Sequence, residues 1–289
     1  MKPLTVICGY LGSGKTTLIN HILKSTSFPI GILVNDFGEL NIDKYLIENE
    51  DELTISLTNG CVCCNLNDDL GDSLNFMLSQ KVKAVILESS GVALPVKMSN
   101  YGTSWPGYKL SKLLTVVEGR TLKQLLSDKF VSKTVKSQII QSDLVYINRY
   151  NDFDLELLSS MNPDYKKEEE LDALLENIFI ETDTVGEILP FVEEHNSLKT
   201  EVLLFDGPIN QEDILNFLDA NPGIERLKGW ISDSENQSWL VQVTRSERDF
   251  TVSKYQTTSR LVVIYKKDLN KKILYKQVNL LVFTITIFF

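Results

Sequence analysis

A glycine-rich turn near the start of the chain constrains the fold more than any other feature of the sequence. The segment PLTVICGYLGSGKTTLINHILK reads as an apolar strand, a turn, and a helix with apolar side chains at helical spacing. Residues 9–16 match G-x-x-x-x-G-K-[ST] in the strand-to-helix setting that a phosphate-binding loop requires. The alternative is a chance match in an ordinary strand-turn-helix.

The chemistry of such a loop explains its composition. Backbone N–H groups converge on a phosphate at a helix N-terminus, and small residues permit that convergence. We expect Lys15 to reach the β- and γ-phosphates and the Thr16 hydroxyl to ligate Mg²⁺. The candidate nucleotide-binding residues in this segment are Gly9, Gly12, Ser13, Gly14, Lys15, Thr16 and Thr17.

A second apolar strand, over residues 84–87, ends in an acidic residue. Glu88 would stand at the carboxyl edge of the sheet beside the phosphate loop, where it can hold Mg²⁺ or a water in its shell. Gly91 can bring its N–H near a γ-phosphate. A solvated acid at a strand end is the alternative. Lys15 and Glu88 are therefore the candidate catalytic residues.

Apolar strands alternate with helical patterns through the rest of the first two thirds of the chain. KLLTVVEG, SDLVYINR and ENIFIETD read as strands, and residues 122–126 and 131–141 as helices. The alternation predicts an α/β fold with a doubly wound, mainly parallel sheet of the P-loop NTPase type.

The last third of the chain predicts a second, smaller α+β domain. EVLLFDG, a helix over residues 211–219, RLKGWI, SWLVQVT and RLVVIYK suggest an antiparallel sheet. The apolar ending NLLVFTITIFF is a last core strand, an interface or an artefact of the chain end. We predict a nucleotide-binding domain at 1–191, a linker at 192–201 and the small domain at 202–289.

Composition narrows the class of protein. A net charge of -10 and a pI of about 4.9 disfavour a nucleic-acid partner, which needs a basic surface. We see no secretory leader and no apolar run of the roughly 18 residues that span a bilayer. We therefore expect a cytoplasmic protein with no membrane partner, in which thiols stay reduced.

Three of the four cysteines are concentrated in GCVCC, residues 60–64. Disulfides between such close neighbours would be strained. Soft thiolates at Cys61, Cys63 and Cys64 favour Zn²⁺, Co²⁺, Ni²⁺ or Cu⁺ over Mg²⁺. They leave a position for Glu39, Asp36, a water or a ligand from a recipient protein. A cluster of small residues near a glycine turn is the alternative reading.

The chain resembles the CobW-like P-loop GTPases, relatives of UreG and HypB. The resemblance covers most of residues 4–151 and lies in GYLGSGKTT, NDFGELNID, GCVCC, ESSGVALP, TVVEG and QIIQSDLVYINRYN, in that order. ERLKGWI resembles the R-x-K-G strand of the CobW C-terminal domain. The family implies GTP hydrolysis coupled to delivery of a transition metal, usually Zn²⁺ or Co²⁺, with the three cysteines as ligands.

The residues that should read the base depart from the family pattern. Guanine-specific relatives carry N-K-x-D, whose carboxylate accepts the N1–H and the exocyclic amine of guanine. The aligned residues here are Asn148, Arg149, Tyr150 and Asn151. An amide at Asn151 offers one acceptor, so guanine selectivity is predicted to be weaker, while Arg149 can stack over the base.

Together these features predict a GTP-binding and GTP-hydrolysing metallochaperone that uses Mg²⁺ and carries Zn²⁺ or Co²⁺ to a recipient metalloprotein. Glu39 is the candidate fourth ligand of the transition metal. The alternative is a metal-responsive nucleotide-binding regulator with little turnover and relaxed guanine specificity. The sequence names neither the recipient nor the oligomeric state, and homo-oligomerisation stays open.

Overall fold

The computed structural model describes residues 1–35, 53–57, 69–180, 198–253, 259–266 and 282–286 of the 289-residue chain. These residues fall into two compact units, one containing the described residues up to 180 and the other those from 198 onward. No helix among them is long and apolar enough to cross a bilayer.

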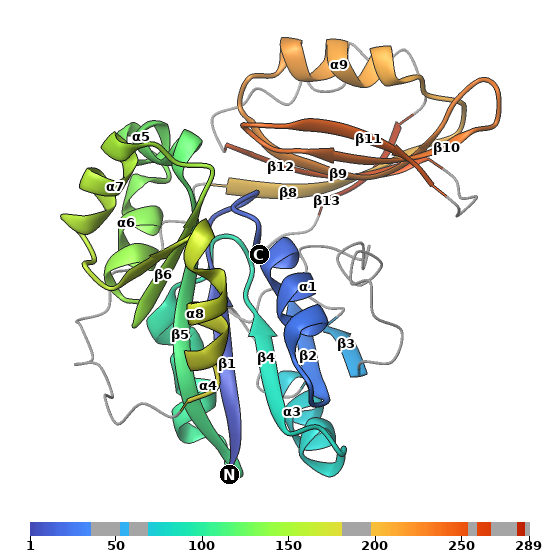
Figure 1. Cartoon of the computed structure of the whole chain (residues 1–289). Coiled ribbons are helices and arrows are strands. Elements are labelled where there is room, and N and C mark those ends of the chain that lie inside the picture. The colour runs from blue at the N-terminus through green and yellow to red at the C-terminus, as the bar shows by residue number, and fades with distance from the viewer. Residues whose placement is uncertain (36–52, 58–68, 181–197, 254–258, 267–281, 287–289) are drawn as a thin grey trace. The chain divides into compact units, whose positions relative to one another are not determined.

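The first unit is built on a parallel sheet. Its strand order, among the described residues, is β3-β2-β4-β1-β5-β6-β7, and every neighbouring pair runs parallel (Figure 1). The predicted α/β fold with a parallel sheet is therefore confirmed. The strands are β1 Lys2–Cys8, β2 Ile30–Asn35, β3 Leu53–Leu57, β4 Ala84–Glu88, β5 Tyr108–Glu118, β6 Leu144–Asn148 and β7 Tyr165–Lys167.

Helices cover both faces of this sheet, because successive side chains of a strand point to opposite faces. In β1, Val6 belongs to the apolar core shared with α3 and α4, and Ile7 to the core shared with α1 and α8. The helices are α1 Lys15–Ser25, α3 Asp69–Ser79, α4 Pro95–Ser104, α5 Gly119–Ser127, α6 Ser132–Ile140, α7 Asp152–Ser159 and α8 Leu171–Asn177, with a 3₁₀ turn at Glu168–Glu170.

One predicted strand of the first unit is wrong. The apolar pattern at residues 176–183 suggested a strand, but α8 ends at Asn177 and Ile178 is buried against the face of the sheet. The Thr5 hydroxyl donates a hydrogen bond to the Ile178 carbonyl at 2.7 Å. The run is apolar because it closes a core, and β7 forms the edge of the sheet instead. Residues 181–183 lie outside the described ranges.

The second unit is an antiparallel sheet with one helix packed on it. The strand order among the described residues is β11-β10-β9-β12-β8-β13, and α9, Gln211–Ala220, buries Ile214, Phe217 and Leu218 against the sheet. The predicted α+β domain is confirmed. The strands are β8 Leu198–Phe205, β9 Ile224–Ser232, β10 Ser238–Val243, β11 Arg248–Val252, β12 Arg260–Lys266 and β13 Val282–Thr286.

Two strands form the margins of this unit in the sequence. β8 begins at Leu198, inside the range predicted as a linker, because residues 198–201 already pair with β12. The apolar ending of the chain contributes β13, which pairs with β8. The described part of that ending, residues 282–286, is therefore a strand of the antiparallel sheet.

Gly229 occupies the middle of β9, between β10 and β12. Its φ is 154°, and a Cβ there would stand 2.1 Å from the Arg260 carbonyl oxygen and 2.9 Å from the Leu261 Cα. Both atoms belong to the backbone of the neighbouring strand, so they cannot move without disturbing the pairing. A glycine is required at this position.

We predict that Gly229→Ala lowers the free energy of unfolding of the second unit by roughly 2–4 kcal/mol, through backbone strain and overpacking. Urea denaturation followed by tryptophan fluorescence measures it. Gly31→Ala in β2 is the matched control, because its Cβ would meet the Sδ atom of Met77, at 2.6 Å, and a methionine side chain can move aside. Equal losses in the two variants would contradict the prediction.

Candidate functional site

The predicted phosphate loop joins β1 to α1 and is held in a conformation that glycine favours. Gly9, Gly12 and Gly14 have φ values of 140°, 80° and 98°. A Cβ at Gly9 would stand 2.4 Å from the Val116 carbonyl oxygen, so the loop packs directly on β5. Gly14 precedes the first helical residue, Lys15, and no side chain caps the helix there. The first-turn N–H groups of α1 therefore point to a site suited to an anion.

Lys15 places a positive charge inside this loop. Its side chain is 7% exposed, and its ammonium donates a hydrogen bond to the Gly9 carbonyl at 3.0 Å. A buried ammonium is costly unless strong acceptors surround it. The ammonium lies against the backbone of the loop, and phosphate oxygens would be stronger acceptors for it than a carbonyl oxygen.

Thr16 and Glu88 form a hydroxyl–carboxylate pair beside the loop. The Thr16 hydroxyl donates to Glu88 Oε1 at 3.3 Å, and Glu88, the last residue of β4, is 4% exposed. Glu88 lies opposite Ile7 of β1 in the sheet register. Two hard oxygen atoms at this separation fit Mg²⁺, which prefers oxygen ligands. The structure thus brings together the two residues predicted to hold that ion.

The segment after Glu88 packs against the phosphate loop. A Cβ at Gly91 would stand 2.3 Å from the Leu11 Cδ2 atom, so glycine is the residue that permits this approach. The Gln138 amide of α6 donates to the carbonyls of Gly91 and Ala93, at 3.2 and 3.0 Å. Gln138 was not among the predicted site residues, because a lone glutamine in a helix carries no signal in the sequence.

A cavity of about 510 Å³ opens beside the loop, between α1 and the carboxyl end of β6. Its wall includes Gly14, Thr17, Tyr146, Asn148, Arg149 and Glu168. The volume lies in the range of small-ligand sites. Predicted nucleotide-binding residues from two distant parts of the sequence therefore share one cavity wall.

Asn148 connects the cavity to the loop. Its amide nitrogen donates to the Ser13 carbonyl at 2.9 Å. The residue is 8% exposed, and its Oδ1 atom has no hydrogen-bond partner in the part of the chain that the structure describes. A buried carbonyl oxygen of this kind is well placed to accept a hydrogen bond from a ligand.

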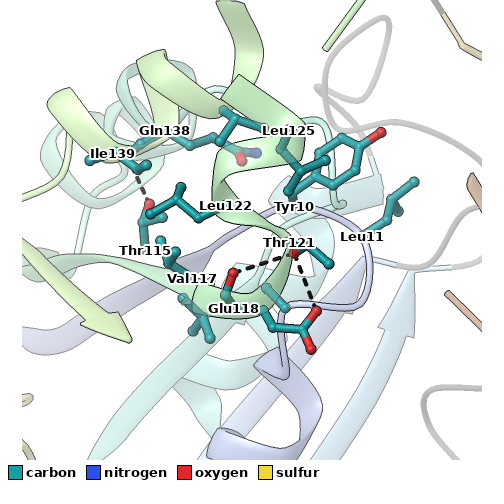
Figure 2. A pocket seen from close by; sticks show the side chains of 13 residues that line it. Tyr10, Leu11, Thr115, Val117, Glu118, Thr121, Leu122, Leu125, Gln138 and Ile139 are labelled. Carbon is teal, nitrogen blue, oxygen red and sulfur yellow. Dashed lines mark hydrogen bonds between the residues drawn. The ribbon is translucent and has the colours of Figure 1, made fainter. Parts of the chain in front are cut away.

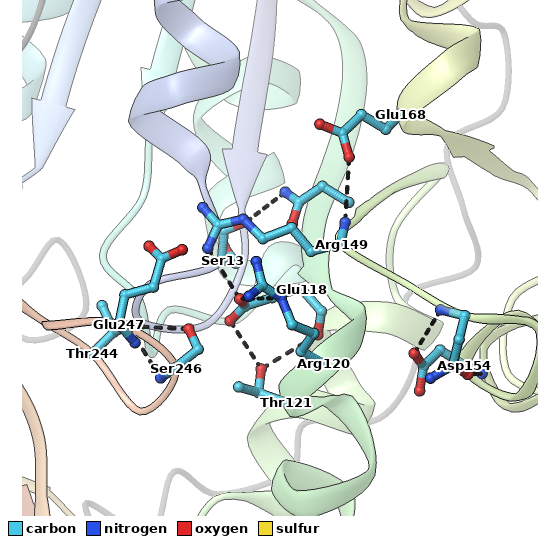
Figure 3. A network of polar contacts seen from close by, with 12 residues as sticks. Ser13, Glu118, Arg120, Thr121, Arg149, Asp154, Glu168, Thr244, Ser246 and Glu247 are labelled. Atoms are coloured by element: carbon cyan, nitrogen blue, oxygen red, sulfur yellow. Dashed lines mark hydrogen bonds and ion pairs between the residues drawn. The ribbon is translucent and has the colours of Figure 1, made fainter.

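Arg149 is held in a polar network (Figure 3). Its φ of 48° is unusual for a residue with a side chain, and its guanidinium pairs with Glu118 Oε1 at 3.1 Å. Thr121 donates to the other oxygen of Glu118 at 3.3 Å. The backbone N–H of Arg149 donates to Glu168 Oε2 at 3.4 Å. The strained turn thus holds Arg149 and Glu168 side by side at the cavity.

The side chain of Asn151 caps a helix. Its side-chain oxygen accepts the Asp154 N–H at 3.1 Å, and the Asp154 carboxylate accepts the Asn151 N–H at 2.9 Å. This reciprocal pair is a capping box at the start of α7. Asn151 is exposed and is not among the residues that line the cavity. The structure brings Asn148 and Arg149 to the cavity, and leaves Asn151 on a helix end.

A second pocket, of about 20 Å³, lies between the phosphate loop and helices α5 and α6 (Figure 2). Tyr10, Leu122 and Leu125 line it together with Glu118 and Thr121. Its volume suits about one water molecule. It is a packing defect behind the loop and too small for a substrate.

The predicted thiol site lies outside the described residues: Cys61, Cys63, Cys64 and Glu39 all fall in residues 36–52 and 58–68. Within the described ranges, no group of three or more His, Cys, Asp or Glu side chains could hold a metal ion. Cys8, in β1, is buried in the apolar core.

A family model described as "CobW/HypB/UreG, nucleotide-binding domain" matches residues 3–176, and one described as "Cobalamin synthesis protein cobW C-terminal domain" matches residues 198–281. The chain is similar to the Zinc-regulated GTPase metalloprotein activator 1 of Dictyostelium discoideum, with 38% identity over 112 residues. The aligned residues cover 34% of this chain and 24% of that protein.

A second relative and a solved structure are also similar to this chain. The Zinc chaperone CobW of Sinorhizobium sp is 35% identical over 130 residues, which cover 40% of this chain and 36% of that protein. The chain spans about a quarter to a third of the length of these two relatives. The crystal structure of Zn(II)-bound YjiA GTPase from E. coli aligns with a TM-score of 0.43 at 20% identity, covering 94% of this chain and 96% of that chain.

Proposed function

This chain belongs to the CobW/HypB/UreG family, and we propose that it hydrolyses GTP and uses the cycle to deliver a transition metal, Zn²⁺ or Co²⁺, to a recipient metalloprotein. The proposed GTP hydrolysis rests on the phosphate loop, in which Lys15 is buried, and on the Thr16–Glu88 pair beside it. The proposed delivery of a metal is supported by the two relatives, which are named a zinc chaperone and a zinc-regulated GTPase metalloprotein activator.

The proposed site assigns each group a task. Lys15 and the first-turn N–H groups of α1 hold the β- and γ-phosphates, and the Gly91 N–H approaches the γ-phosphate. Thr16 and Glu88 would hold Mg²⁺, which neutralises charge on the phosphate oxygens. Thr17 and Asn148, which share the wall of the neighbouring cavity, lie where the nucleoside would extend from the phosphates. Positioning and charge stabilisation are the main contributions that phosphoryl transfer needs from a protein.

We predict that Lys15→Ala weakens binding of Mg-GTP at least tenfold, since a charge-assisted hydrogen bond is worth roughly 1.5–3 kcal/mol. Titration with a fluorescent GTP analogue measures the affinity. Lys81→Ala, which removes an exposed lysine before β4, is the control and should bind as the wild type does. Wild-type affinity in Lys15→Ala would remove the phosphate-loop assignment.

The proposed cargo site consists of Cys61, Cys63 and Cys64, with Glu39 as a candidate fourth ligand. β2 ends at Asn35 and β3 at Leu57, and these two residues pair in the sheet. The preceding residue of β2, Val34, pairs with Glu88. Both segments that contain the proposed ligands therefore begin at the carboxyl ends of the strands, where Glu88 also lies. An incomplete set of protein ligands suits transfer, because a recipient can supply the missing one.

The position of the strand ends also limits how far the thiols can be from the nucleotide. Cys61 follows Leu57 by four residues, which span at most about 14 Å when fully extended. β3 and β4 are separated by β2, so Leu57 is about 10 Å from the line of β4. These two lengths limit the distance from Cys61 to the end of β4. We propose that the thiols lie close enough to the γ-phosphate for hydrolysis to change their geometry, in a cytoplasmic protein whose thiols stay reduced.

We predict that metal affinity depends on the bound nucleotide by about 5- to 150-fold, the range of a coupling free energy of 1–3 kcal/mol. Zn²⁺ or Co²⁺ titration in competition with a chelator measures it in the nucleotide-free, GDP and non-hydrolysable GTP states.

Two outcomes of that titration would contradict the proposal. Equal metal affinities in the three states would mean that the thiols are not coupled to the nucleotide. Undiminished binding after Cys61, Cys63 and Cys64 are all changed to Ser would place the metal elsewhere. Cys8→Ser is the matched control, because Cys8 is buried in β1 and should not contribute.

One observation favours the alternative, a metal-responsive regulator with little turnover and relaxed guanine specificity. Asn151 replaces the aspartate of the guanine-reading motif, and its side chain caps α7. If base reading were lost with that aspartate, GTP and ATP would compete equally for the site. The regulator also requires that phosphate release be negligible with either nucleotide.

A further inference from the structure

We propose that Glu168 selects guanine over adenine in this chain, in the place of the aspartate that guanine-specific relatives carry at the position of Asn151. The proposal rests on the nucleotide-binding function above and assigns the specificity of the same site. Glu168 begins the 3₁₀ turn Glu168–Glu170 and lines the cavity of about 510 Å³ beside the phosphate loop.

The side chain of Asn151 is engaged in the N-terminal cap of α7. Its side-chain oxygen accepts the Asp154 N–H, and its own N–H is held by the Asp154 carboxylate. Turning the amide toward a base would break a capping box that stabilises the start of α7. Even if it turned, an amide presents one acceptor where guanine offers two donors.

The Glu168 carboxylate lies at the cavity and is held there by a backbone contact. One oxygen accepts the backbone N–H of Arg149 at 3.4 Å, and that N–H belongs to a residue whose φ of 48° turns the chain at the end of β6. Figure 3 shows Glu168 above Arg149 in this network. A carboxylate has about four acceptor positions, so this contact orients Glu168 and leaves acceptor capacity for a ligand.

The charge of Glu168 reaches the cavity wall. Burial raises the pKa of Tyr146 to about 12, and the negative charges of Glu168 and Glu169 contribute in the same direction. Tyr146 lines the same cavity. Lys24 and Arg149 supply positive charge to the same wall, and Glu168 is the carboxylate that lines it. A carboxylate at this place favours a base edge that donates hydrogen bonds.

An independent observation indicates that a polar ligand belongs in this cavity. Asn148 is 8% exposed and lines the cavity, and its Oδ1 atom lacks a hydrogen-bond partner among the described residues. Its amide nitrogen already donates to Ser13 of the phosphate loop. The same side chain thus joins the loop to a buried acceptor in the cavity.

The chemistry of the two purines gives the sign of the selection. Guanine presents N1–H and an exocyclic amine side by side, and one carboxylate can accept both. Adenine presents the lone pair of N1 on that edge, which a carboxylate repels. Replacing the carboxylate with an amide should therefore weaken guanine binding and leave adenine binding unchanged or improved.

The neighbouring acid provides a matched control. Glu169 accepts the Tyr150 hydroxyl at 2.5 Å and is not among the residues that line the cavity. Glu169→Gln makes the same chemical change one residue away. It should leave the preference for guanine as it is in the wild type.

The test is competition of GDP and ADP, in the presence of Mg²⁺, against a fluorescent nucleotide on the full chain. We expect the wild type to bind GDP more tightly than ADP. Glu168→Gln should lower the ratio of the two affinities by roughly 10- to 150-fold, through GDP. Glu169→Gln and Asn151→Asp should leave the ratio unchanged, since aspartate caps a helix as well as asparagine does.

The outcomes separate this proposal from the one it rests on. A wild-type chain that binds neither nucleotide would overturn both. A chain that binds nucleotide, with a ratio that Glu168→Gln leaves unchanged, would overturn the role of Glu168 alone. A tenfold or larger rise in the ratio for Asn151→Asp would assign base reading to position 151 instead. Thermal unfolding of each variant checks that the fold is intact.

Discussion

The burial of the Lys15 ammonium within a loop of glycines is the interaction on which the proposed nucleotide site of the first unit depends. Its contact with the Gly9 carbonyl requires the loop to curve back on itself, and the positive φ values of its glycines permit that curve. β5 supports the loop through the Val116 carbonyl, and β6 supports it through the Asn148 amide. Phosphate oxygens are stronger acceptors than a single carbonyl, so a bound nucleotide would stabilise this charge further.

The parallel sheet gathers the rest of the proposed chemistry at the same edge. Strands that run in one direction end together, and the register of β2, β3 and β4 brings Val34 and Glu88 into one row. The chain then leaves β2 and β3 toward Glu39 and the three cysteines. A γ-phosphate held by Lys15 would therefore be near the origin of both segments, which is the physical basis of the proposed coupling between hydrolysis and metal affinity.

The sequence predicted what depends on local pattern. The G-x-x-x-x-G-K-T spacing identified the phosphate loop, and four apolar residues before an acid identified the end of β4. It failed where tertiary packing decides. The apolar run at residues 176–183 was predicted as a strand, but Ile178 closes the core against β1. No local pattern pointed to Glu168, because the cavity wall combines residues 14–24, 146–149 and 168–171, which are far apart in the sequence. One acid within an acidic stretch carries no signal of its own.

The central claim is that this chain couples nucleotide turnover to a transition metal. The most direct test is phosphate release from GTP and from ATP, each with and without one equivalent of Zn²⁺ or Co²⁺. The proposed function predicts faster release from GTP than from ATP, at a rate that changes when either metal is added. Absence of release from both nucleotides, or a GTP rate that is the same with and without metal, would contradict the claim.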